Sequence, residues 1–295
     1  MMQLTSRAGI HSYIELTKPR VVSLIAFTAI VGMLLSVPGP VPVDKFVFGL
    51  IGIWLAAASA AAFNHLLDRR ADAEMQRTRH RPLPTGYLNE AQVLTYAASL
   101  GLASMLLLYF AVNPLTALLT FFSLIGYAVI YTVFLKRVTP QNIVIGGAAG
   151  AAPPVLGWVA ITGQISPEPL LLFLIVFVWT PPHFWALAIH RKDDYAKVEI
   201  PMLPVTHGVE FTGLQILFYT ILLLIVSIFP YLIGMSGIIY LVGAIILGVV
   251  FIYYAVALKF FPNENLPMRT FSFSITYLLG IFLLLLFDHY IALVL

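Results

Sequence analysis

The sequence has no cysteine and little charge. Its 295 residues contain no Cys, and Asp, Glu, Lys and Arg together make up only 10%. The lack of thiols excludes disulfides, thiolate-ligated iron and cysteine-based zinc sites. The scarcity of charge, together with 60% hydrophobic residues and a mean hydropathy of +0.95, is typical of an integral membrane protein and not of a soluble one. The polar start of the chain also lacks the apolar core and cleavage site of a signal peptide, so we expect none.

Long hydrophobic runs divide the chain into nine predicted transmembrane helices. Each run is close to the roughly 20 apolar residues that cross a bilayer as a helix. They cover residues 20–37, 46–67, 92–112, 115–134, 142–161, 169–189, 212–233, 237–258 and 271–293. We therefore expect an all-α fold, with residues 1–295 forming a single intramembrane domain.

Positive charge is distributed unevenly between the two ends of these spans. With nine spans, every Lys and Arg except Lys45 falls on the same side of the membrane. The positive-inside rule then predicts a cytoplasmic N-terminus, with residues 1–19 as a cytoplasmic segment, and an external C-terminus. The long cytoplasmic loops, 68–91 and 190–211, are where we expect the active site. Cations so close to the membrane indicate contact with anionic membrane lipid and no nucleic-acid partner.

Oxygen-bearing side chains recur where the second span meets its basic loop. Asn64, Asp68 and Asp72 are four residues apart, a spacing that places them on one helix face. Carboxylate and amide oxygens suit Mg²⁺, which in turn suits a diphosphate, and arginines such as Arg81 bind anionic oxygens. The sixth span ends in a similar pattern, with Asp194 four residues after His190. The alternative is that these acids only pair with neighbouring cations at a solvated membrane edge.

Longer stretches of sequence resemble a known family. Asn64, Asp68 and Asp72, followed by Arg-Pro-Leu at 81–83, are similar to the first acidic motif of the UbiA superfamily of intramembrane prenyltransferases. Residues 15–34 and 179–204 resemble the protoheme farnesyltransferases within it. The resemblance implies nine helices and Mg²⁺ as cofactor. It also implies transfer of a farnesyl group from farnesyl diphosphate to a vinyl group of protoheme IX, with addition of water, to give heme O.

The resemblance also assigns roles to individual residues. It implies Mg²⁺ ligands at Asn64, Asp68, Asp72 and Asp194, the three aspartates being catalytic together with Lys197. It places on the diphosphate side Arg81, Tyr131, Lys136, Arg137 and His190. Where His190 stands, the superfamily commonly has an aspartate. Because imidazole is a poor Mg²⁺ ligand, we expect His190 to hydrogen-bond the diphosphate or a metal-bound water.

Other polar residues near the spans have two interpretations. His183 lies inside the sixth span after Pro181 and Pro182. It either serves the heme side of the reaction or is a neutral imidazole bonded to a carbonyl that the prolines leave free. Lys18 fits membrane anchoring at least as well as catalysis, and we expect His65 to be structural.

Three other functions were weighed against this one. A UbiA-type enzyme acting on a quinone or chlorophyll precursor fits the same metal–diphosphate site. A transporter would be expected to carry more polar residues at mid-membrane, and an assembly subunit of a respiratory complex leaves the paired acidic motifs unexplained. For the favoured function we expect a bacterial inner membrane location, with heme A synthase or the terminal oxidase as downstream partner.

Overall fold

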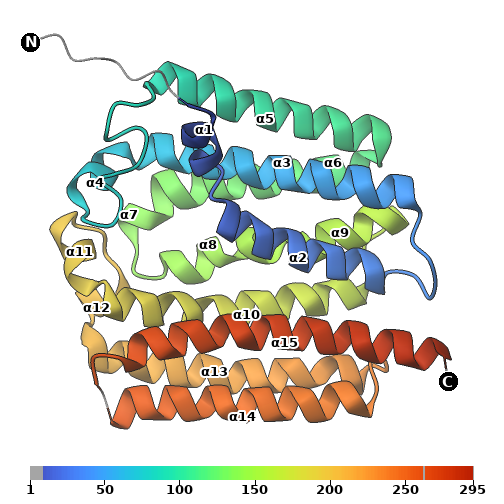
Figure 1. Cartoon of the computed structure of the whole chain (residues 1–295). Coiled ribbons are helices and arrows are strands. Elements are labelled where there is room, and N and C mark those ends of the chain that lie inside the picture. The colour runs from blue at the N-terminus through green and yellow to red at the C-terminus, as the bar shows by residue number, and fades with distance from the viewer. Residues whose placement is uncertain (1–8, 262, 295) are drawn as a thin grey trace, which may run out of the picture.

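The structure is a computed structural model that describes residues 9–261 and 263–294, and these residues form helices without any β-strand. The elements are α1 (Ile10–Leu16), α2 (Pro19–Leu35), α3 (Val43–Leu67), α4 (Arg69–Glu74), α5 (Glu90–Ala111), α6 (Pro114–Ile125), η1 (Gly126–Leu135), α7 (Lys136–Val138), α8 (Asn142–Ala151), α9 (Pro153–Thr162), α10 (Pro167–His190), α11 (Lys192–Lys197), α12 (Leu203–Thr206), α13 (Gly208–Leu232), α14 (Ile238–Phe260) and α15 (Leu266–Val294). Figure 1 shows the helices as a bundle, with α1 toward its left end and the last turns of α15 at its right end.

The expected all-α membrane architecture is confirmed. Within the described residues, eight helical stretches are long and apolar enough to cross a membrane. A ninth is present if α1 and α2, which meet at a bend of 53°, count as one span. Each of the nine predicted runs coincides with one of these stretches. The orientation of the termini across the membrane stays a prediction.

Two spans are less regular than hydropathy predicts. The run expected over 115–134 begins as α6, continues as the π-helical segment η1 and ends in α7. The run expected over 142–161 is divided into α8 and α9 at Ala152, directly before the prolines at 153 and 154. A π-helix adds a residue to each turn and is often found at functional sites, because it changes the direction in which side chains point.

The long helices pack so that the short helices between them gather at one end of the bundle. In the first part of the chain α3 packs against α5 and α2 against α9, while α10 packs against α13 and α15 in the second part. Helix α8 lies between them and contacts both α10 and η1. Figure 1 shows α1, α4, α7, α11 and α12 together at the left, and we call this the site end of the bundle.

Small residues allow α2 and α9 to approach closely. A Cβ added at Gly157 would lie 2.1 Å from the backbone oxygen of Ala29, and one added at Gly32 would lie 2.1 Å from that of Pro154. Neither backbone oxygen can move aside as a flexible side chain would. This contact fixes α2, and therefore the position of the α1–α2 bend at the site end.

We predict that Gly157→Ala lowers the stability of the protein by about 1–3 kcal/mol, because the new methyl group overpacks the α2–α9 contact. The matched control is Gly150→Ala in the preceding helix α8, where an added Cβ meets no atom within 4 Å. That control should retain or slightly raise stability, since alanine favours the helix. Thermal unfolding of the two purified variants in detergent checks the difference, and equal melting temperatures would contradict it.

Candidate active site at the end of the bundle

The first acidic motif keeps its helical spacing where α3 ends. The backbone N–H of Asp68 donates to the carbonyl of Asn64 at 2.9 Å, and that of Asp72 donates to the carbonyl of Asp68 at 2.8 Å. Asp68 is the residue at which α3 ends and α4 begins, and Asp72 lies in the first turn of α4. All three side chains are buried, at 3–4% exposure. The backbone thus keeps its helical hydrogen bonds across the junction of α3 and α4. This brings Asn64, Asp68 and Asp72 onto the same face, as their spacing predicted.

Cations from three different parts of the chain meet these side chains. Lys136 Nζ donates to Asp68 Oδ2 at 2.5 Å, and Arg81 Nη1 donates to Asp72 Oδ2 at 2.6 Å. Lys18 Nζ donates to Asn64 Oδ1, and Asn64 Nδ2 donates to Asp68 Oδ2 at 2.7 Å. Side-chain bonds thus join Lys18, Asn64, Asp68 and Lys136, and the Arg81–Asp72 pair is joined to them through the backbone bond between Asp72 and Asp68. We call these residues the network. Both ion pairs use Oδ2, so Oδ1 of each aspartate does not take part in the ion pair.

Local backbone geometry positions one of these cations, Lys18. Lys18 has φ of 48°, in the left-handed region that residues other than glycine rarely adopt, and Pro19 follows it at the start of α2. This bend directs Lys18 toward α3. Burial, reinforced by the charges of Arg81 and Lys136, lowers the pKa of Lys18 to about 7. The crowding of positive charge makes this end of the bundle electrostatically suited to an anion.

The π-helical segment places further groups against the motif. Thr132 in η1 accepts a hydrogen bond from Asn64 Nδ2 at 3.4 Å and donates one to the carbonyl of Tyr127 at 2.9 Å. Lys136 begins α7 directly after η1. A Cβ added at Gly146 of α8 would lie 2.1 Å from the Tyr131 ring, so only glycine leaves room for this tyrosine. The predicted site residues Tyr131 and Lys136 are therefore brought to the same place by η1.

The second acidic motif lies at the end of α10. Asp194 is in the first turn of α11, and no ion pair joins it to another described residue. Its neighbour Tyr195 is half-buried. Burial raises the pKa of Tyr195, the charges of Arg77 and Arg191 lower it, and the charges of Asp194 and Asp68 raise it. Carboxylates from two different helix ends therefore act electrostatically on the same tyrosine.

Not every predicted residue lies inside this network. His190, Lys197 and Arg137 are exposed at the site end. Within residues 9–261 and 263–294, no three acidic or histidine side chains converge closely enough to form a metal site. The residue types nevertheless suit Mg²⁺, because Asn64, Asp68 and Asp72 place carboxylate and amide oxygens on one buried face, and Mg²⁺ prefers oxygen ligands. Their role as ligands, and that of Asp194, stays a prediction.

His183 is held in the bundle by α15. Its Nδ1 is 2.6 Å from the hydroxyl of Ser274, and its ring stacks between Trp179 and Phe271 at centroid distances of 4.2 and 4.5 Å. Helix α10 continues through Pro181 and Pro182 without a break. The partner of the imidazole is therefore a hydroxyl, and not the proline-freed carbonyl that one interpretation of the sequence expected.

The structure brings Lys18, Thr132 and Tyr195 to the site end, whereas the sequence left two interpretations for Lys18 and did not single out the other two residues. A signal for Lys18 was present, because a cation followed by proline stands just before the first span. Thr132 and Tyr195 carried no such signal, since an apolar run with one threonine, or a tyrosine near a membrane edge, is common.

Fold and site together define a class of protein: a helical membrane protein in which cations and carboxylates are buried together at one end of the bundle. The model of the UbiA prenyltransferase family matches residues 25–290, and the chain belongs to this family. It is a prenyltransferase, as the sequence motifs predicted. A relative from Methylococcus capsulatus named protoheme IX farnesyltransferase is 62% identical over 96% of this chain and 95% of its own length.

Solved structures agree with this fold. A structure described for digeranylgeranylglyceryl phosphate synthase has a TM-score of 0.80 at 20% identity and covers 95% of this chain and 98% of its own. A UbiA homolog from Archaeoglobus fulgidus, bound to DMAPP and Mg²⁺, has a TM-score of 0.64 at 16% identity and covers 93% and 99%. The expected helical fold is confirmed by both.

We predict that Lys136→Gln lowers stability by about 3 kcal/mol, because it leaves the buried Asp68 carboxylate without its cation. Adding Asp68→Asn to this variant should restore much of the loss, since no buried charge then remains unpaired. The control is Arg137→Gln, which removes the adjacent exposed cation. Melting temperatures of the four proteins check this, and a double variant no more stable than Lys136→Gln alone would count against the pairing.

Proposed function

We propose that this prenyltransferase transfers the farnesyl group of farnesyl diphosphate to a vinyl group of protoheme IX and adds water, giving heme O. The observation that carries the proposal is the 62% identity, over nearly the full length of both chains, to a relative named protoheme IX farnesyltransferase. Support comes from the acid–cation network at the end of α3, whose residue types suit a diphosphate and its metal.

In the proposed reaction the allylic C–O bond of farnesyl diphosphate breaks and diphosphate leaves with the electron pair. The farnesyl carbon forms a C–C bond to the outer vinyl carbon, water adds to the inner carbon, and one proton is released. Lys136, Arg81 and Lys18 would bind the diphosphate oxygens and stabilise the charge that develops on them. When bound at Asn64, Asp68 and Asp72, Mg²⁺ would supply Lewis-acid charge to the same leaving group.

The surroundings of the network suit a reactive allylic cation. Tyr127 and Tyr131 of η1 have ring centroids 5.5 Å apart, and Thr132 of the same segment accepts a hydrogen bond from Asn64, beside Asp68, which is 3% exposed. Aromatic rings exclude water and stabilise nearby positive charge. We propose the inner membrane of a bacterium as the location of this chain, and the distribution of its cations supports a cytoplasmic position of the site end. Heme A synthase or a terminal oxidase would receive the product.

We predict that Asp68→Asn and Asp72→Asn each lower farnesyl transfer at least about 100-fold, because each removes charge needed to hold the metal–diphosphate pair. Chelation of Mg²⁺ with EDTA should abolish turnover in the unmodified enzyme. The measurement is mass spectrometry of heme extracted after incubation of purified protein with Mg²⁺, protoheme and farnesyl diphosphate.

The matched control for that experiment is Asp44→Asn, an exposed aspartate in the first turn of α3 at the far end of the same helix. It should transfer farnesyl normally. Mesoheme, in which the vinyl groups are reduced, should give no adduct. Absence of a hydroxylated farnesyl adduct with protoheme, or full activity of both site variants, would refute the proposal.

A further inference from the structure

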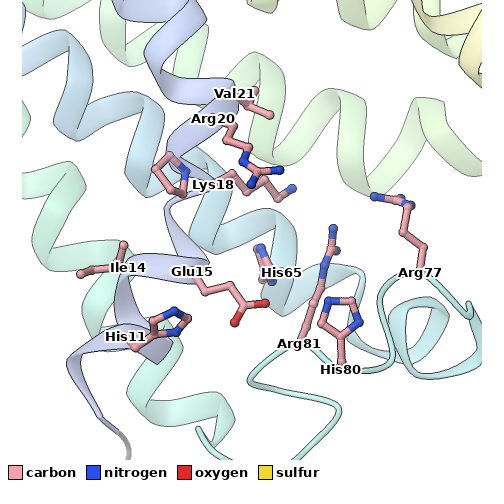
Figure 2. Close-up of a pocket in the computed structure, with 11 residues that line it drawn as sticks. His11, Ile14, Glu15, Lys18, Arg20, Val21, His65, Arg77, His80 and Arg81 are labelled. Atoms are coloured by element: carbon pink, nitrogen blue, oxygen red, sulfur yellow. The ribbon is translucent and has the colours of Figure 1, made fainter. Parts of the chain in front are cut away.

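A second polar cavity adjoins the network on another face of α3. It has a volume of about 490 Å³ and lies between the α1–α2 bend and the segment that follows α4 (Figure 2). Its charged and histidine lining consists of Lys18, Arg20, Arg77 and Arg81, with His11, His65 and His80, against a single acid, Glu15. A cavity of this size is within the range of small-molecule sites. Its strong excess of positive charge suits an anionic ligand.

His65 is the buried group of this cavity. It is 2% exposed, and neither ring nitrogen has a hydrogen-bond partner among the described residues. A buried polar group without a partner is destabilising, so such groups are rare in folded proteins unless a ligand or solvent satisfies them. Figure 2 shows the His65 ring between the side chains of Lys18 and Arg81. We expected His65 to be structural, but among the described residues it does not make the hydrogen bond that a structural histidine would make.

The cavity and the acidic network lie on different sides of α3 and suit different ligands. His65 follows Asn64 directly, so the two side chains point about 100° apart around α3. The carboxylates that suit a metal lie with Asn64, whereas the cavity has Glu15 as the only acid in its lining. Arg20 and Arg77 form no ion pair with a described residue. A metal–diphosphate pair therefore fits the Asn64 side, and an anion that needs no metal fits the His65 side.

The lining also has an apolar part. Ile14 and Val21 line the cavity and are 50% and 56% exposed. Apolar side chains beside arginines suit a ligand that combines a flat hydrophobic body with carboxylates on one edge. Of the two substrates in the proposed reaction, protoheme has this character, because its two propionates share one edge of the macrocycle.

We infer that this cavity binds the propionate carboxylates of the acceptor, with Arg20 and Arg77 as ion-pair partners and His65 as a buried hydrogen-bond donor. The inference rests on the proposed function for the identity of the acceptor. Lys18 and Arg81 line the cavity and also contact Asn64 and Asp72, so the acceptor would bind directly beside the diphosphate.

The experiment is a titration of purified protein with protoheme and with protoheme dimethyl ester, followed by heme absorbance without farnesyl diphosphate. We expect the ester to bind about tenfold more weakly, because it cannot form charge-assisted hydrogen bonds. Arg20→Gln, a substitution at an exposed position, should weaken protoheme binding about tenfold and leave ester binding unchanged. His65→Leu should weaken protoheme binding, whereas His65→Gln, which keeps a donor, should retain more of it.

The matched control is Arg70→Gln, an exposed arginine at the same end that does not line the cavity. It should bind both hemes as the unmodified protein does. Farnesyl diphosphate binding with Mg²⁺, measured by calorimetry, should be unchanged by Arg20→Gln. If Arg20→Gln weakens farnesyl diphosphate binding and leaves protoheme binding intact, or if acid and ester bind equally, the inference is overturned. Selective heme binding without any farnesyl adduct would refute only the proposed reaction.

Discussion

The pairing of two buried carboxylates with cations from distant parts of the chain is the interaction on which the site end depends. Asp68 and Asp72 are both nearly inaccessible, and isolated carboxylates in such surroundings would be strongly destabilising. Lys136 and Arg81 neutralise them, and Asn64 links Asp68 to Lys18. The α1–α2 bend, the end of η1 and the loop after α4 are thereby tied to the end of α3. The cations that pair with these carboxylates are also those that an anionic substrate would need.

The packing of the spans serves this arrangement. Without a strong hydrophobic force between helices in lipid, close contacts at small residues hold a bundle together. Gly32 and Gly157 bring α2 against α9, and Gly146 leaves room for Tyr131 of η1. These contacts lie on the helices that carry Lys18 and Lys136. The glycines are therefore as much a part of the site's geometry as the charged residues are.

The spans were predictable from sequence because hydropathy reports on the surroundings of about 20 consecutive residues at once. The Asn64, Asp68 and Asp72 face was also predictable, since it depends only on local helix geometry. The resemblance also placed Arg81 and Lys136 at this site, but the ion pairs that they form with Asp72 and Asp68, and the contact of Lys18 with Asn64, were not predictable. That Lys18 reaches Asn64 from 46 positions away depends on a backbone bend with φ of 48°. That Lys136 reaches Asp68 depends on a π-helical segment within an unremarkable apolar run.

The adjacency of Asn64 and His65 gives α3 a double role. One residue belongs to a network of carboxylates and cations, and the next lines a cavity with a strong excess of positive charge. Lys18 and Arg81 take part in both, so an anion on either side draws on charge that the other side shares. Two anionic substrates would then compete for these cations unless further positive charge arrived with one of them. A divalent metal carried in with the diphosphate would supply that charge on the acidic side and leave Arg20, Arg77 and His65 for the carboxylates of the acceptor.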